Sequence, residues 1–160
     1  MLRYFFEKGF MKNLLLFFTL FVSTGVFGQT FTTDPAFPVA DQPMTLTIDV
    51  TGVTSLEDES EVWLWAFLPN CTSDCDAITN VDPATSEADP AKFSATANPN
   101  EYTLTFTPTD IFDKTASEID RIGFVVKAES FAAGQTGDLF FDLSDGSLQL
   151  NLTQPSENYT

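Results

Sequence analysis

The sequence predicts an all-β fold, and three observations carry this prediction. Apolar residues alternate with polar ones at a period of two in most segments, which is the pattern of strands with one buried face. Threonine and aromatic residues, which favour the pleated surface, are frequent in these segments. Turn-forming residues separate the segments at short intervals. About seven short strands of this kind predict a two-sheet β-sandwich of the immunoglobulin-like kind, with an open barrel as the alternative.

Six segments carry the strand pattern. In chain order they cover residues 44–50, 62–68, 102–107, 121–128, 138–143 and 147–152. In all but the second, one set of alternate positions is apolar and is expected to face the core. The core is therefore predicted to include Leu46, Ile48, Leu104, Phe106, Ile122, Phe124, Val126, Phe141 and Leu143.

The segments between these strands predict turns and little helix. NPNE at 98–101 and SDGS at 144–147 are turn sequences, and AAGQTGD at 132–138 is a longer connection. Two stretches, TPTDIF and TASEID, each predict one helical turn, with Thr109 and Ser117 as the caps. Residues 70–97 form the longest stretch without a strand pattern and predict a surface excursion.

The N-terminus predicts a secretory signal peptide over residues 1–28. Met11 and Lys12 precede the apolar run NLLLFFTLFV, and small residues, including Gly28, follow it. The run is shorter than the roughly 20 apolar residues of a membrane-spanning helix, so a membrane anchor is the less favoured alternative. Cleavage after Gly28 makes Gln29 the first mature residue, and residues 1–10 are then an upstream extension. The mature protein is expected to be secreted, periplasmic or on the cell surface.

The charge of the chain excludes several classes of partner. Without residues 1–28 the chain has 132 residues (160 − 28), the size of one domain. It then holds four cationic residues against 22 acidic ones, because Glu7 is removed, and its net charge is −18 (4 − 22). Such a surface repels nucleic acids and anionic membranes, so we expect neither as a partner.

The stretch WLWAF is the candidate binding surface. Trp63, Trp65 and Phe67 would share one face of a strand, and the opposite face is also apolar. Two interpretations are open. The aromatic row is buried, in a central strand or under a loop, or it is exposed and stacks on the apolar faces of sugar rings. Burial is favoured, because exposed rows of tryptophan promote aggregation.

Two cysteines, Cys71 and Cys75, follow this strand. In an exported protein, two cysteines this close in sequence predict a disulfide that shapes a small loop. Zinc is the alternative, but the chain has no histidine and no further cysteine to complete a site, so we expect no metal. The aspartates of residues 74–82 and 138–145 could offer oxygens to Ca²⁺, but their spacing fits no calcium motif. We interpret them as solvated surface.

Catalysis is not expected. The absence of histidine excludes a histidine-based triad or general base. Paired carboxylates could hydrolyse glycosides, but in so acidic a chain any such pair is uninformative. We therefore predict no catalytic residue and no cofactor.

Three motifs, in the same order, resemble a known family. FTTDPAFPVADQPMTLTIDVTG is similar to its P-x-x-P-x-A-D-x-P-x-T-x-T opening, and VWLWAFLP is similar to its V-Y-x-W-A-W strand. Residues 105–143 are similar to its T-x-T-P, I-G-F-x-x-K and G-Q-T-x-D-x-F-x-D-V block. The family comprises the N-terminal immunoglobulin-like modules of Bacteroidetes-type secreted starch-acting proteins. The resemblance covers nearly all of residues 30–152.

The resemblance implies a non-catalytic β-sandwich module over residues 29–152, attached to an exported carbohydrate-active protein. Its expected role is weak glycan binding, with an α-glucan as ligand, or spacing. A structural or adhesion domain without sugar affinity is the alternative. Relatives continue after their exit strand, so residues 153–160 are expected to be a linker to an adjacent domain of the same polypeptide. Trp63, Trp65 and Phe67 are the candidate ligand-binding residues.

Overall fold

The computed structural model describes residues 28–86 and 89–146. The predicted signal peptide before Gly28, the strand expected at 147–152 and the predicted linker at 153–160 lie outside these ranges. Within them the chain forms seven strands in two antiparallel sheets, with one short α-helix and one 3-10 turn, which confirms the all-β prediction. In the same ranges, no helix has the length and apolar content needed to cross a bilayer.

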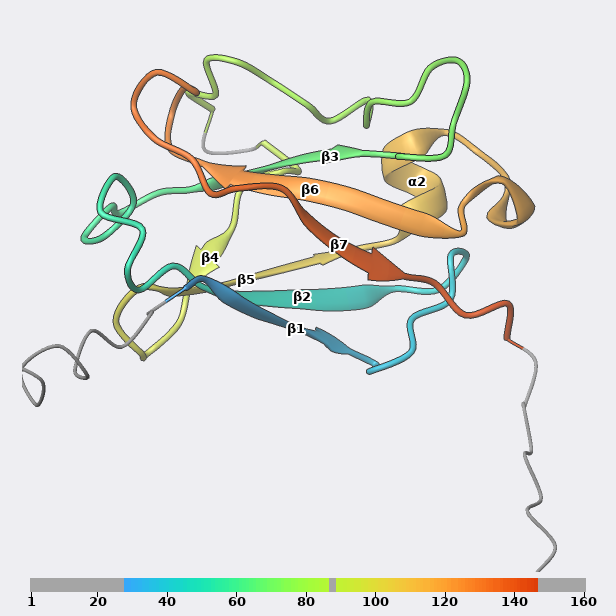
Figure 1. The fold of residues 1–160 in the computed structure, drawn as a ribbon, viewed down its shortest axis with the longest axis horizontal. Helices are drawn as coiled ribbons and strands as arrows, with labels where there is room; N and C mark the ends of the chain where they lie inside the picture. Colours follow the sequence, from blue (N-terminus) through green and yellow to red (C-terminus); the bar gives the residue numbers. More distant parts are fainter. Residues whose placement is uncertain (1–27, 87–88, 147–160) are drawn as a thin grey trace, which may run out of the picture.

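The first sheet has the strand order β1-β2-β5-β4 (Figure 1). Its strands are β1 (Thr30–Asp34), β2 (Met44–Asp49), β5 (Glu101–Phe106) and the two-residue β4 (Ser94–Ala95). The second sheet has the order β3-β6-β7, built from β3 (Trp63–Phe67), β6 (Arg121–Lys127) and β7 (Leu139–Asp142). Figure 1 shows the two sheets as layers, one above the other.

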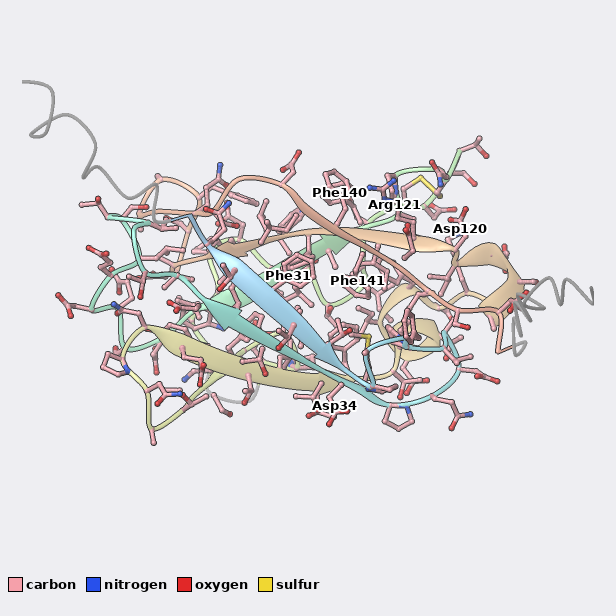
Figure 2. All side chains as sticks on the ribbon, turned by 60° about the horizontal axis from the view of Figure 1, so that its bottom comes forward. Phe31, Asp34, Asp120, Arg121, Phe140 and Phe141 are labelled. Atoms are coloured by element: carbon pink, nitrogen blue, oxygen red, sulfur yellow. A yellow bond between two sulfur atoms is a disulfide. The ribbon has the colours of Figure 1, made fainter. Side chains whose placement is uncertain are left out.

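The core lies between the two layers. Leu46, Ile48, Phe106, Ile122, Phe124 and Val126 are buried as predicted, and the predicted Leu104, Phe141 and Leu143 are partly buried against the same cluster. Aromatic contacts join the layers, since the ring of Phe31 on β1 lies 5.2 Å from that of Phe124 on β6. Figure 2 shows Phe31 and Phe141 together between the sheets. Strand alternation thus predicted the buried face of each regular strand.

The two predicted helical turns are present, but their caps differ from the prediction. Helix α2 (Pro108–Phe112) begins after Thr107, not Thr109, because Pro108 occupies its first turn, where the missing N–H costs nothing. The 3-10 turn η1 (Ala116–Glu118) begins after Thr115, not Ser117. There the Glu118 carboxylate accepts hydrogen bonds from the Thr115 backbone N–H and hydroxyl, which lowers the pKa of Glu118.

The excursion after β3 is more ordered than its composition predicts. It runs from Asn70 back along the free edge of β3 and ends in β4, so the backbone of β3 is hydrogen-bonded on both edges. The Leu64 N–H donates to Ala91 O at 2.8 Å, and the Leu68 N–H donates to Cys75 O at 2.8 Å. The excursion therefore takes the place of a neighbouring strand and protects an edge that would otherwise invite association.

A side chain completes this pairing at Ala66. The Asn80 amide oxygen accepts from the Ala66 N–H at 2.9 Å, and its NH₂ donates to Ala66 O at 2.8 Å. The Ala77 N–H donates to the same carbonyl at 3.0 Å. One asparagine side chain thus presents the donor and acceptor of a strand backbone.

The disulfide between Cys71 and Cys75 is present, as predicted. Their Cα atoms lie 5.5 Å apart, and the bond closes the turn by which the chain leaves β3 and reverses along its edge. The Cys71 N–H donates to Leu68 O at 3.3 Å, which anchors the same turn to the strand.

We expect Asn80→Ala to lower the free energy of unfolding by about 1–3 kcal/mol, because it leaves the Ala66 N–H without its acceptor. Chemical denaturation measures this loss. Asn70→Ala is the matched control in the same excursion. The Asn70 amide reaches only Asp120, at the exposed surface, so its removal should cost within about 0.5 kcal/mol. Equal costs at the two positions would contradict the bridging role of Asn80.

Reduction of the disulfide should leave the fold intact. The closed loop spans only four positions in sequence, so the loss in unfolding free energy should be about 1–2 kcal/mol. Thiol labelling should fail before a reductant is added and succeed after it, while circular dichroism stays that of a β protein. A cooperative loss of the sheet signal on reduction would show that the turn supports more than its own loop.

Candidate functional site

The outer face of the second sheet carries the aromatic residues that the sequence selected. Trp63, Trp65 and Phe67 point away from the core, whereas the alternate residues of β3 belong to the core cluster. The three are not equally accessible. Trp63 is only 3 % exposed, while Trp65 and Phe67 are partly exposed. The open part of this face is therefore at the Phe67 end of β3.

Two phenylalanine rings meet at that end. Phe67 on β3 and Phe140 on β7 contact edge to face, with ring centroids 5.9 Å apart. They close over Gly123 of β6, where an added Cβ would lie 2.5 Å from the Phe67 ring and 2.9 Å from the Phe140 ring. A glycine is required between the strands because the two rings occupy its side-chain position.

A cation extends this surface. The Arg121 guanidinium lies 5.0 Å from the centroid of Phe140, and it also pairs with Asp142 at 3.6 Å. Figure 2 shows Arg121 and Phe140 on the opposite side of the sheet from Phe31. On β3, Trp65 continues the row and contacts Phe131 of the β6–β7 connection, with ring centroids 4.9 Å apart. We call Trp65, Phe67, Phe131 and Phe140 the aromatic strip.

Two loops cover the other end of the face, over Trp63. The excursion and the β6–β7 connection join there, as the Ala84 N–H donates to Glu129 O at 2.7 Å. Lys127, which is fully buried, pairs with Asp82 at 3.4 Å and donates to Glu129 O at 3.0 Å. A buried cation without such partners would be strongly destabilising, so Lys127 ties the excursion to β6.

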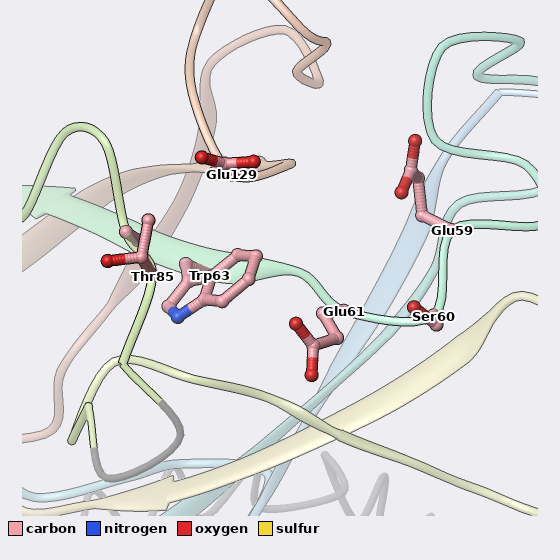
Figure 3. A pocket seen from close by; sticks show the side chains of 7 residues that line it. Glu59, Ser60, Glu61, Trp63, Thr85 and Glu129 are labelled. Carbon is pink, nitrogen blue, oxygen red and sulfur yellow. The ribbon is translucent and has the colours of Figure 1, made fainter.

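A polar hollow remains beside the covered tryptophan (Figure 3). We call it the Trp63 pocket, and its volume is about 250 Å³. It is lined by Glu59, Ser60, Glu61, Trp63, Ala84, Thr85 and Glu129. Three of these residues are acidic, so the pocket disfavours anions.

The wall of the Trp63 pocket is held by two contacts. The Lys92 ammonium bonds to Glu61 at 2.6 Å and lies 5.7 Å from the centroid of the Trp63 ring. The Tyr102 hydroxyl donates to Glu59 O, which fixes the segment before β3. Burial, with smaller contributions from the charges of Glu59 and Asp58, raises the pKa of Tyr102, so this hydroxyl stays a donor.

No group of three acidic or thiol ligands suitable for a metal occurs in residues 28–86 and 89–146. Asp82, considered from the sequence as an oxygen donor, is engaged with Lys127 and with the Phe131 N–H at 3.2 Å. Its role is to join the two loops.

Sequence reasoning missed half of the aromatic strip. Phe140 lies on the face of β7 opposite to Phe141, and a period-two pattern marks it only as an apolar residue at a polar position. A phenylalanine where the alternation expects a polar residue was the signal that could have identified Phe140 as part of an exposed aromatic surface. Phe131 lies in a loop, where no periodicity applies, and nothing in the sequence connected it with Trp65.

No family model matches the chain, and no curated protein matches it significantly.

We expect Gly123→Ala to destabilise the protein by about 1–3 kcal/mol, because the new methyl group displaces the two rings above it. Chemical denaturation of Gly123→Ala, of Phe67→Leu and of the double variant Gly123→Ala/Phe67→Leu tests the cause. Gly123→Ala should lower the free energy of unfolding less in the Phe67→Leu protein, where the closest ring is absent, than in the wild type. The difference between these two losses is the coupling energy of residues 67 and 123. An equal cost in both backgrounds would mean that the ring contact is not responsible.

Proposed function

We propose that this protein is a non-catalytic accessory module of an exported carbohydrate-active protein, and that its aromatic strip binds a glycan weakly. The partner is an α-glucan, and an adjacent domain of the same polypeptide carries any catalysis. The proposal includes an immunoglobulin-like β-sandwich as the fold and export by the predicted signal peptide.

The strand order supports the fold assignment. In constant-type immunoglobulin domains, the strands named A to G in sequence order form one sheet A-B-E-D and a second sheet C-F-G. The orders β1-β2-β5-β4 and β3-β6-β7 correspond to these position by position. A chain that merely closed into a barrel would pair strands from the two sheets, whereas the described strands pair only within each sheet.

The accessibility of the strip supports glycan binding, and this is the observation that carries the proposal. Phe140 is 38 % exposed, and Trp65 and Phe67 are partly exposed beside it. Aromatic faces stack on the apolar faces of sugar rings, and a neighbouring guanidinium such as Arg121 donates hydrogen bonds to hydroxyl groups. The strip and Arg121 offer both on the outer face of the second sheet.

One observation favours the alternative, a structural or adhesion module without sugar affinity. The rings of the strip contact each other in edge-to-face pairs, Phe67 with Phe140 and Trp65 with Phe131. Such pairs contribute about 0.5–1.5 kcal/mol beyond burial, so the strip also serves packing. The two roles differ in one measurable respect, the response of Trp65 to a glucan.

A soluble α-glucan should quench tryptophan fluorescence saturably, with a dissociation constant of about 10⁻⁴ to 10⁻³ M. One or two stacking contacts provide only a few kcal/mol before ordering costs, which sets this weak range. Trp65→Ala should abolish the quench while the protein stays folded. Trp63→Phe is the matched control and should retain it, because Trp63 is covered by the two loops.

The stability of the same positions gives an independent check. Trp63→Ala should cost about 3–5 kcal/mol, as expected for a buried aromatic residue, and Trp65→Ala should cost clearly less. A folded protein that shows no quench at any glucan concentration would favour the structural module over the glycan-binding one.

A further inference from the structure

One side of the sandwich is closed less completely than the rest of the core. Phe31 on β1, together with Leu139, Phe141 and Leu143 on or directly after β7, packs against the core cluster but stays partly exposed. We call these four residues the β1–β7 seam, because β1 and β7 are edge strands of the two sheets. Figure 2 shows Phe31 and Phe141 between β1 and β7, and their ring centroids lie 6.3 Å apart. A row of partly exposed apolar side chains marks a surface that another element can cover.

The seam also has a free strand edge. Strand β7 is the last strand of its sheet, and no described strand pairs with the edge of β7 that faces away from β6. The Leu143 N–H donates to Asp120 O at 2.8 Å, on the β6 side. Amides alternate in direction along a strand, so the N–H groups of Phe140 and Asp142 point to the free edge. This edge of β7 can therefore pair with one more strand.

The chain turns beside this edge where the described range ends. The Ser144 N–H donates to Pro38 O at 2.7 Å, and Ser144 forms a bridge with Val39. The Gly146 N–H donates to Ser144 Oγ at 3.2 Å, and Gly146 has a φ of 76°. A left-handed residue, for which glycine is favoured, is common in the loops of hairpins. The backbone of residues 144–146 is thus suited to reversing the chain next to β7.

The sequence that follows has the pattern of a strand with one buried face. Residues 147–152, SLQLNL, alternate Leu148, Leu150 and Leu152 with three polar residues. The segment carries no charge, although the net charge of the chain is −16. Fully extended it spans about 20 Å, enough to run along the four residues of β7.

Bonds already made at the turn restrict how this segment can pair with β7. A two-residue loop would need the Ser144 N–H and a three-residue loop would need the Leu143 N–H, and both are bonded elsewhere. A loop of four residues, 143–146, needs neither of them. It pairs Asp142 with Ser147.

We infer that residues 147–152 pair with the free edge of β7 as one further strand and cover the β1–β7 seam. Directly opposed residues share a face of a sheet, so Leu148 lies beside Phe141 and Leu150 lies beside Leu139. The occupant of the seam is this chain's own segment. The inference does not depend on glycan binding by the aromatic strip.

Cross-strand nuclear Overhauser effects in the wild-type protein test the register. In an antiparallel pair, opposed residues that exchange no hydrogen bonds have the closest backbones. Phe141 with Leu148, and Leu139 with Leu150, should therefore each give a strong Hα–Hα signal. The absence of both signals would overturn the inference.

Amide hydrogen exchange of Phe140 and Asp142 measures the docking itself. Leu150→Asp places a charge against the seam and should speed exchange of both amides at least about tenfold, the factor expected for losing one buried leucine. Gln149→Asp is the matched control, because it adds the same charge one position away on the opposite face. It should change the exchange rates by less than about threefold. The central amides of β6 should stay protected in both variants, which shows that the sandwich remains folded.

Three other results would contradict the inference. Fast exchange of the Phe140 and Asp142 amides in the wild type means that the edge of β7 is uncovered. Equal acceleration by Gln149→Asp means that added charge, and not an inward-facing leucine, is responsible. Cross-strand signals only between differently labelled copies, with a dimeric mass in light scattering, mean that a second molecule covers the seam.

Discussion

The structure depends on covering one strand, β3, on its core face, along its free edge and over the Trp63 end of its outer face. Its inner side chains enter the core, and its outer face carries two tryptophans and a phenylalanine. Left uncovered, such a strand would expose apolar rings and unpaired backbone groups, the features that promote edge-to-edge association. Two irregular segments, the excursion and the β6–β7 connection, provide this cover. The excursion bonds to the free edge of β3, and together with the β6–β7 connection it closes over Trp63.

This cover also determines where function can reside. The Lys127–Asp82 pair and the Ala84–Glu129 bond join the two loops at one end of the outer face. That end becomes the acidic Trp63 pocket, whereas the other end stays open as the aromatic strip. Residues that share one face of one strand therefore have different environments, and only the open end can stack on a large ligand. At the covered end, the two loops leave only a small acidic hollow beside the indole ring.

The regular strands of this fold could be predicted well from the sequence. The arrangement of the excursion and the β6–β7 connection around β3 could hardly be predicted at all. Alternation located β2, β5, β6 and β7 and their buried faces, because each strand has a core side that selects apolar residues. Strand β1 was missed, since Phe31 is its one large apolar residue, and β4 has only two residues. The Asn80 bridge follows no period, because side-chain bonds to backbone depend on where the chain returns in space. For the same reason the sequence could group Trp63 with Trp65 but could not tell which of them the loops cover.

Native-state hydrogen exchange of the β3 amides tests the cover most directly. The amides of Leu64, Ala66 and Leu68 face the excursion, and their acceptors are Ala91 O, Asn80 Oδ1 and Cys75 O. If the excursion acts as a neighbouring strand, these three amides exchange only through global unfolding, as slowly as the central amides of β6. If they exchange orders of magnitude faster than those amides, the edge of β3 opens on its own, and the account of an edge covered by the excursion is wrong.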